Sequence, residues 1–256
     1  MKKLFSLIIL LACVVLPTLG QRHEIVSSRI ASLQVVAGDN WMELPVITLG
    51  QQTPIVISFD DLTHDYHRYA YKLEHCEADW TVSEEIFESD YCEGFAQGNT
   101  IEDFKQSLNT NQLYTHYRLN IPNERCNIKI GGNYKVTVYD EHNEDAVAFT
   151  ACFMVLEPRM GVNMEMTTNT DADINGRHQQ LSVKVDYGSV RVTDPSAQVK
   201  TVIMQNGRWD NAVVNSKPQY INYNGLMWNH SRDLIFDGGN EYRKFEMLDM
   251  SHTTMG

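Results

Sequence analysis

The stretch Ile55-Val56-Ile57-Ser58-Phe59 sets the pattern that decides the fold. β-Branched and aromatic residues dominate it, and such residues fit the pleated, half-buried surface of a strand. Four further runs of similar composition precede residue 157, each bounded by Gly, Asn, Asp or Pro. These runs are residues 69–73, 114–121, 134–139 and 147–155. We therefore expect β-strands at all five positions.

Helical patterns are nearly absent between these runs. Residues 81–93 have apolar positions too sparse for a long amphipathic helix and predict one or two turns at most. Residues 109–112 and 123–132 are expected to be loops, because Asn and Gly interrupt them. Short strands without intervening helices are typical of antiparallel sandwiches. The predicted fold class is all-β, with tandem antiparallel, immunoglobulin-like β-sandwich domains and minor helix.

Glu157-Pro158-Arg159 marks the expected joint between two domains, because Pro158 ends the preceding strand and a new alternation starts at Val162. The first domain is predicted over residues 21–157 and the second over 158–256. In the second, residues 199–205 and 209–214 flank Asn206-Gly207, a strong type I′ hairpin signal.

The first twenty residues have the composition of a signal peptide. Lys2 and Lys3 precede an apolar run from Leu4 to Leu16, and small residues lie before an expected cleavage near Gly20/Gln21. A lipoprotein signal with Cys13 as the acylated residue is the alternative. No later run approaches eighteen apolar residues, so no membrane-spanning segment is predicted.

The charge balance is strongly acidic, with 33 Asp and Glu against 21 Lys and Arg. Removal of Lys2 and Lys3 with the leader would leave a net charge of −14. Such a chain repels phosphate backbones and anionic lipid surfaces. The expected partner is therefore a protein, with no nucleic acid and no direct membrane insertion.

Four cysteines follow the leader: Cys76, Cys92, Cys126 and Cys152. In an exported protein they could form two disulfides with three possible connectivities, or remain reduced. Zinc held by His75, Cys76 and Cys92 is a further alternative, although no C-x-x-C occurs.

Residues 171–176 are similar to the opening of a calcium loop. Asp171, Asp173 and Asn175 place oxygen ligands at alternate positions before Gly176. The twelfth position is Ser182, where a bidentate Glu would be required. A polar turn between strands is therefore the favoured interpretation, and these three residues remain a weak metal candidate.

Catalytic motifs are not found. The chain contains no G-x-S-x-G, H-E-x-x-H, G-x-x-x-x-G-K or G-x-G-x-x-G motif in the required context. We expect no enzymatic activity and no cofactor. A secreted hydrolase with paired carboxylates is retained as a hypothesis, because the separation such a pair needs is spatial.

The residues at 242–250 predict a strand for which the sequence supplies no following partner. A terminal strand of this kind would expose unpaired backbone groups. The expectation is an incomplete second domain in a chain that is C-terminally truncated.

Five segments together resemble the plug protein family of the bacterial type IX secretion system. They are Ser58-Phe59-Asp60-Asp61-Leu62, Tyr71-Lys72-Leu73-Glu74-His75-Cys76-Glu77-Ala78-Asp79-Trp80, Thr115-His116-Tyr117-Arg118-Leu119, Gln205-Asn206-Gly207-Arg208-Trp209-Asp210-Asn211-Ala212 and Gly238-Gly239-Asn240-Glu241-Tyr242-Arg243. Their order and spacing match across essentially the whole chain after the leader.

The resemblance implies a periplasmic, outer-membrane-associated protein that binds a giant outer-membrane β-barrel translocon and occludes its periplasmic opening. Its motif residues read as fold determinants, and the partner-binding residues are unknown. Those motif residues are Asp60, Asp61, His75, Cys76, Asp79, Trp80, Asn206, Gly207, Arg208, Trp209, Asp210, Gly238, Gly239 and Asn240.

A carbohydrate-binding or adhesive surface module is the alternative function. It would present clustered, exposed aromatic side chains on one sheet face. The candidates for such a cluster are Trp41, Trp80, Trp209 and Trp228.

Overall fold

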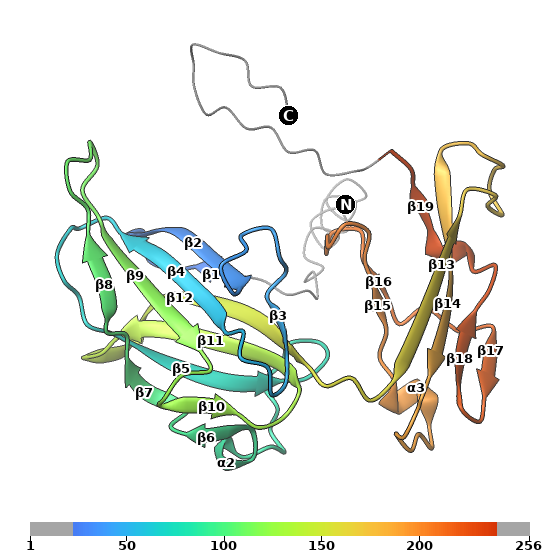
Figure 1. The fold of residues 1–256 in the computed structure, drawn as a ribbon, viewed down its shortest axis with the longest axis horizontal. Coiled ribbons are helices and arrows are strands. Elements are labelled where there is room, and N and C mark those ends of the chain that lie inside the picture. Colours follow the sequence, from blue (N-terminus) through green and yellow to red (C-terminus); the bar gives the residue numbers. More distant parts are fainter. Residues whose placement is uncertain (1–22, 240–256) are drawn as a thin grey trace, which may run out of the picture. The chain divides into compact units, whose positions relative to one another are not determined.

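A computed structural model describes residues 23–239 of the chain (Figure 1). The expected signal peptide, the motif residue Asn240 and the expected strand at 242–250 lie outside the described residues. The chain divides into two compact units, and the division falls between Pro158 and Arg159. Each unit is described by itself.

The first unit contains two sheets. The six-stranded sheet has the order β1-β12-β11-β5-β7, with β3 beside β12, and the four-stranded sheet has the order β2-β4-β9-β8. All neighbours are antiparallel except β3 and β12, which are parallel. The strands are β1 (Glu24–Ile25), β2 (Ile30–Ala37), β3 (Val46–Thr48), β4 (Ile55–Asp61), β5 (Tyr69–Cys76), β7 (Gln97–Thr100), β8 (Asp103–Gln106), β9 (Thr115–Ile121), β11 (Gly132–Asp140) and β12 (Asn143–Leu156).

The core of this unit lies between the two sheets, where alternate side chains from each strand face inward. Phe59 is fully buried, and its ring centroid lies 4.7 Å from that of Phe149, 5.1 Å from Tyr117 and 5.4 Å from Tyr69. The rings therefore come from both sheets and join them. Other buried residues of the same cluster are Ile55, Ile57, Tyr71, Leu73, Leu119, Ile121, Tyr134, Val136, Val138, Ala151, Phe153 and Val155.

A small ribbon and a helical turn close one end of the first unit. The ribbon pairs β6 (Cys92–Gly94) with β10 (Cys126–Ile128), and α2 (Glu88–Tyr91) precedes it (Figure 1). The four-residue helix α2 agrees with the short helix predicted within residues 81–93. The prediction of a continuous loop over 123–132 was wrong at β10, because Cys126 and Ile128 are buried and pair with β6.

The second unit is built on a five-stranded antiparallel sheet. Its order is β13-β14-β18-β17, with β19 also beside β14. A separate two-stranded ribbon joins β15 and β16, and its residues Ile203 and Val213 pack against the core of the sheet. The elements are β13 (Gly161–Thr167), β14 (His178–Asp186), α3 (Pro195–Gln198), β15 (Val202–Ile203), β16 (Val213–Val214), β17 (Tyr220–Asn222), β18 (Gly225–Trp228), the 3₁₀ helix η1 (Arg232–Leu234) and β19 (Ile235–Asp237).

The core of the second unit is smaller and centres on Trp228, which is 1% exposed and donates from its indole nitrogen to the Ser216 carbonyl oxygen at 2.9 Å. Strand β13 contributes little to this core, because all seven of its residues are exposed. Val162, Met164 and Met166 project from one side of this edge strand into solvent.

The turn predicted at Asn206-Gly207 is present, but the hairpin around it is much shorter than expected. Both residues have positive φ, 56° and 68°, and the Arg208 amide donates to the Gln205 carbonyl. Only Val202–Ile203 and Val213–Val214 pair as strands. The remaining residues of the predicted strands form irregular backbone, with a second turn at Trp209–Ala212.

The predicted all-β fold class with minor helix is confirmed. Its five expected strands of the first unit correspond to β4, β5, β9, β11 and β12. The alternation at Val162 and at Leu181 corresponds to β13 and β14.

Replacement of Phe59 tests the contribution of the aromatic contacts between the sheets. We expect Phe59→Ala to lower the free energy of unfolding by about 3–5 kcal/mol, because the cavity it leaves is lined by rings from both sheets. Phe95→Ala is the matched control, since Phe95 is 72% exposed and its loss should change stability by less than about 0.5 kcal/mol. Urea unfolding measures both, and equal effects would contradict this account of the core.

Candidate functional site

The first family motif surrounds a buried carboxylate at the end of β4. Asp61 is 0% exposed and accepts hydrogen bonds from the Tyr69 hydroxyl at 2.6 Å, the Thr63 amide at 2.9 Å and the Thr63 hydroxyl at 2.7 Å. Burial by itself raises the pKa of Asp61, but these bonds and the nearby His67 outweigh it and hold the pKa below its usual value. The neighbouring Asp60 lies 2.7 Å from Nδ1 of His116 on β9. Both aspartates thus bind protein groups.

The second motif forms a tight turn after β5. The Glu77 amide donates to the Thr81 carbonyl, the Trp80 amide donates to the Glu77 carbonyl, and Trp80 has a φ of 68°. Asp79 accepts from the amide and hydroxyl of Thr81 at 3.1 and 2.6 Å. The hydrogen bonds of Asp79 are those expected of an aspartate that stabilises a turn.

The buried residues His75 and Ser83 form a chain of polar contacts with the exposed Glu77. Nδ1 of His75 lies 2.8 Å from the Ser83 hydroxyl, which donates to Glu77 at 2.6 Å. A nucleophilic serine needs its proton to be taken by the histidine, with the carboxylate on the far side of the ring. Here the serine lies between the other two groups, so the order differs from that of a catalytic triad.

The zinc ligands considered from sequence are not brought together. His75 and Cys76 are consecutive residues of β5 and project to opposite sides of the strand. The sulfur of Cys92 lies instead beside Cys126, at 2.8 Å. Within residues 23–239, no three His, Cys, Asp or Glu side chains gather as a potential metal site.

The motif residues of the second unit lie in its turns. Asn206 and Gly207 form the turn described above, and Arg208 binds Asp210 through both of its carboxylate oxygens. The Gly238 amide donates to the Arg177 carbonyl at 2.6 Å, and a Cβ at this position would lie 3.0 Å from the same oxygen. Trp209 is half-buried.

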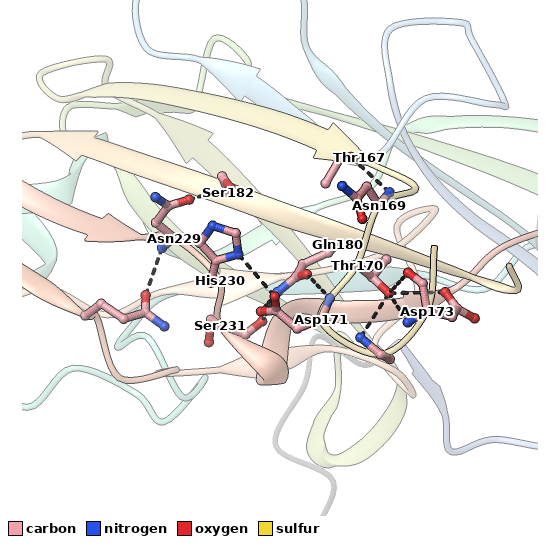
Figure 2. A network of polar contacts seen from close by, with 12 residues as sticks. Thr167, Asn169, Thr170, Asp171, Asp173, Gln180, Ser182, Asn229, His230 and Ser231 are labelled. Carbon is pink, nitrogen blue, oxygen red and sulfur yellow. Dashed lines mark hydrogen bonds and ion pairs between the residues drawn. The ribbon is translucent and has the colours of Figure 1, made fainter. Parts of the chain in front are cut away.

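A polar network fixes the loop between β13 and β14 (Figure 2). At its centre, the buried amide of Gln180 accepts from the Asp171 amide at 2.8 Å and donates to the Asp171 carboxylate at 2.9 Å and the Ser231 carbonyl at 3.1 Å. The Asp171 carboxylate also contacts Nδ1 of His230 at 3.2 Å. The network therefore ties the loop to the segment before η1.

The other members of the calcium-like sequence also point at protein groups. Asp173 accepts from the Arg177 amide at 3.0 Å and lies 2.8 Å from Nδ1 of His178. Asn175 accepts from the Thr168 hydroxyl at 2.7 Å. Gly176 is required by this packing, because a Cβ would lie 2.3 Å from the Asp173 carboxylate. The geometry is that of a turn stabilised by hydrogen bonds to neighbouring protein groups.

The carboxylates that titrate abnormally in the described residues all shift in the same direction. Hydrogen bonds from Gln180 and His178 lower the pKa values of Asp171 and Asp173, as other bonds do for Asp61. A hollow of about 640 Å³ beside His178 is lined by Asp237 and neighbouring loop residues. A glycosidase general acid requires a raised pKa. These shifts therefore give no support to the hydrolase hypothesis.

The four tryptophans, all within the described residues, do not form an exposed cluster. Trp228 is buried, Trp80 and Trp209 are half-buried, and Trp41 alone is exposed, at 62%. An aromatic platform for a sugar ring would need several such rings on one face. The arrangement therefore does not favour the carbohydrate-binding alternative.

The sequence pointed to Trp41 only as a member of an aromatic cluster and did not predict the exposed apolar loop between β2 and β3 in which it lies. Trp41, Met42 and Leu44 are exposed. Asn40 accepts from the Met42 amide at 3.1 Å, and Asp39 binds Arg118 at 2.6 Å. Tryptophan and methionine are enriched at protein interfaces. The sequence signal for this loop was Asn40, a turn-forming residue, followed directly by the large apolar residues Trp41 and Met42.

The fold and its turns define an all-β protein of tandem sheet-based units. The family model described as "Type 9 secretion system plug protein 1st domain" matches residues 30–157. The chain belongs to this family of secretion-system proteins, as its motifs indicated.

The solved structures that match this chain include one that is similar to most of it. It is the crystal structure of a hypothetical protein from Parabacteroides merdae, with 39% sequence identity and a TM-score of 0.83. The match covers 92% of this chain and 59% of that chain, so this chain spans less than two thirds of the solved protein's length. No curated protein matches the chain. Among the helices of residues 23–239, none has the length and apolar character needed to span a membrane.

Replacement of Tyr69 tests the buried network of Asp61. We expect Tyr69→Phe to cost about 1.5–3 kcal/mol at pH 7, because it removes a hydrogen bond to a charged group. In the native protein, the Asp61 contribution is present above the unfolded pKa of about 3.9 and is lost as the pH falls through the lower folded pKa. Without the hydroxyl, the folded pKa of Asp61 rises toward the unfolded value, so Tyr69→Phe should lose less stability than the native protein between pH 7 and pH 3.

Urea unfolding from pH 7 to pH 3 measures this difference. Tyr66→Phe is the matched control, since Tyr66 is an exposed tyrosine of the same unit and should behave as the native chain does. Parallel pH profiles for all three proteins would show that Asp61 does not depend on Tyr69.

Calcium addition tests the weak metal candidate at Asp171, Asp173 and Asn175. Their oxygens already accept protein hydrogen bonds, so we expect Ca²⁺ at roughly 1 mM, where weak extracellular sites bind, to leave the melting temperature unchanged. A saturable rise with Ca²⁺ that Mg²⁺ does not reproduce and that Asp171→Asn/Asp173→Asn abolishes would establish a calcium site instead.

Proposed function

We propose that this chain is an exported periplasmic protein that binds the outer-membrane translocon barrel of the type 9 secretion system and occludes its periplasmic opening. Membership of the plug protein family is the observation that carries the proposal. The leader pattern around Lys2, Lys3 and the apolar run to Leu16, with cleavage near Gln21, supports export. The acidic balance of the chain supports a protein partner.

The proposed mechanism is steric, and it requires a body that keeps its shape. The first unit supplies this property, because rings from both of its sheets meet in one core around Phe59. Well-packed interiors are dense and resist compression. The loops can then vary without changing the sheets, which suits a protein that must match an opening.

The loop containing Trp41 and Met42 is the proposed contact surface. It is apolar and exposed. The Met42 amide bonds to the Asn40 side chain and the Asp39 carboxylate pairs with Arg118, and both contacts restrain the loop before any partner binds. A preorganised loop loses less conformational freedom on binding than a disordered one. Tryptophan is also prominent among residues whose removal costs the most binding energy.

Affinity purification tests binding. The native full-length protein, tagged and extracted from envelopes in mild detergent, should retain a very large outer-membrane barrel. Trp41→Asp/Met42→Asp should reduce recovery roughly tenfold or more, because a charge would be buried in the interface. Leu108→Asp is the matched control, since Leu108 is an exposed loop residue of the same unit and should leave recovery unchanged.

Conductance across planar bilayers tests occlusion separately. Barrels purified without this protein should pass ions freely, and addition of the native protein should close them. Binding without closure would make the protein a partner of the barrel and not its plug. Recovery of no barrel in the purification would contradict both parts of the proposal.

A further inference from the structure

Two buried sulfur atoms meet where the β6–β10 ribbon closes the first unit. Sγ of Cys92 and Sγ of Cys126 lie 2.8 Å apart, and both residues are buried. This distance is shorter than the roughly 3.5–4.0 Å at which non-bonded carbon atoms pack. It is longer than the S–S bond of about 2.05 Å in a disulfide. The two thiols are therefore held in immediate contact.

The register of the ribbon explains why the sulfurs are so close. Cys126 lies opposite Gly94, and Cys92 lies opposite Ile128. The two cysteines are therefore diagonal neighbours that project from the same face of the ribbon. Gly94 has a φ of 104°, and a Cβ there would lie 2.2 Å from the Arg125 carbonyl oxygen. Only glycine allows this close approach of the two strands.

The surrounding backbone holds each cysteine in place. Asn123 accepts from the Arg125 and Cys126 amides at 2.9 and 3.0 Å, which fixes the turn into β10. On the other strand, the Cys92 amide donates to the carbonyl of Glu88, the first residue of α2, and so caps the helix. The juxtaposition is thus a property of the folded ribbon.

We propose that Cys92 and Cys126 form the disulfide of this protein. The two thiols lose two protons and two electrons as the S–S bond forms. A disulfide-bonded oxidant, either a protein or oxidised glutathione, accepts the electrons and is reduced to two thiols. The bond joins the β5–β7 connection to the β9–β11 connection and so locks the end of the sandwich.

The other two cysteines have no comparable geometry with each other. Cys76 lies on β5 and Cys152 on β12, and β11 runs between these strands. Two strand spacings separate their backbones by roughly 9–10 Å. The Cα atoms of a disulfide lie at most about 6.8 Å apart. The structure therefore supports one disulfide, between Cys92 and Cys126, and not the two disulfides that the cysteine count allowed.

Burial of the two sulfur atoms also affects the stage of folding at which the disulfide forms and its resistance to reduction. It raises the pKa values of both the Cys92 and Cys126 thiols, so they stay protonated in the reduced native protein. The thiolate is the reactive form in disulfide exchange. Oxidation is therefore faster while the chain folds, and the finished bond is shielded from external thiols.

Peptide mapping of the exported chain tests the pairing. The protein is alkylated under denaturing, non-reducing conditions and digested. We expect a single cross-linked peptide pair containing Cys92 and Cys126, with Cys76 and Cys152 alkylated. A second arm refolds the reduced chain with oxidised glutathione and should give the same product with the loss of two hydrogens.

Each outcome of the two arms is decisive. Alkylation of all four cysteines in both arms, or a different connectivity, would overturn the proposal. Cross-linking in the refolding arm alone would support the pairing and count against the proposed export.

Thermal unfolding gives an independent measure of the bond. A reductant applied during unfolding and refolding should lower the melting temperature of the native chain by roughly 5–15 °C, given the length of the loop that the bond closes. Cys92→Ala/Cys126→Ala should be insensitive to the reductant. If this variant does not fold, the mapping of the native chain still decides the question.

Discussion

The first unit depends on aromatic rings that pack between its two sheets. Phe59 lies nearly parallel to Tyr117, with an interplanar angle of 8°, and meets Phe149 and Tyr69 edge to face. Several of these rings are tyrosines, and a buried hydroxyl must find a hydrogen-bond partner. The hydrogen bonds that satisfy these hydroxyls connect the ordered core to the loops.

The hydroxyls of four buried tyrosines bond to groups that lie in connecting segments, at a strand end or, for Tyr91 of α2, within β5. Tyr69 donates to Asp61, Tyr117 to the His67 carbonyl, Tyr91 to the Leu73 carbonyl and Tyr134 to the Ile130 carbonyl. Each bond links a side chain of the core to backbone or to a carboxylate near a strand end. The result is a sandwich whose connecting segments are hydrogen-bonded to its core.

Strand positions in the first unit were predictable because burial on one face imposes a period of two. The same reasoning overestimated the ribbon around Asn206-Gly207, where the turn formed but the flanking residues did not pair beyond Val202–Ile203 and Val213–Val214. Turn chemistry is local, whereas strand pairing depends on what the second unit's small core can cover. The local turn signal therefore predicted the turn but could not predict the length of the ribbon.

The candidate sites were also predictable only in part. Asp171, Asp173 and Asn175 were assigned to a polar turn from the missing twelfth ligand, and the structure shows their hydrogen bonds to Gln180, His178 and Thr168. The contact between Cys92 and Cys126 could not be read from spacing, because 34 positions of chain separate them and the register of β6 and β10 decides it. The exposure of Trp41 likewise depends on the path of the loop.

The bare edge of β13 has a practical consequence for work with this chain. Among residues 23–239, β13 pairs only with β14, and its seven residues, Val162, Met164 and Met166 included, are exposed. An uncovered strand of this kind can template pairing with a second molecule. Purification at high protein concentration would then favour aggregation through the second unit. A charged residue engineered at position 164 would be a rational way to increase solubility.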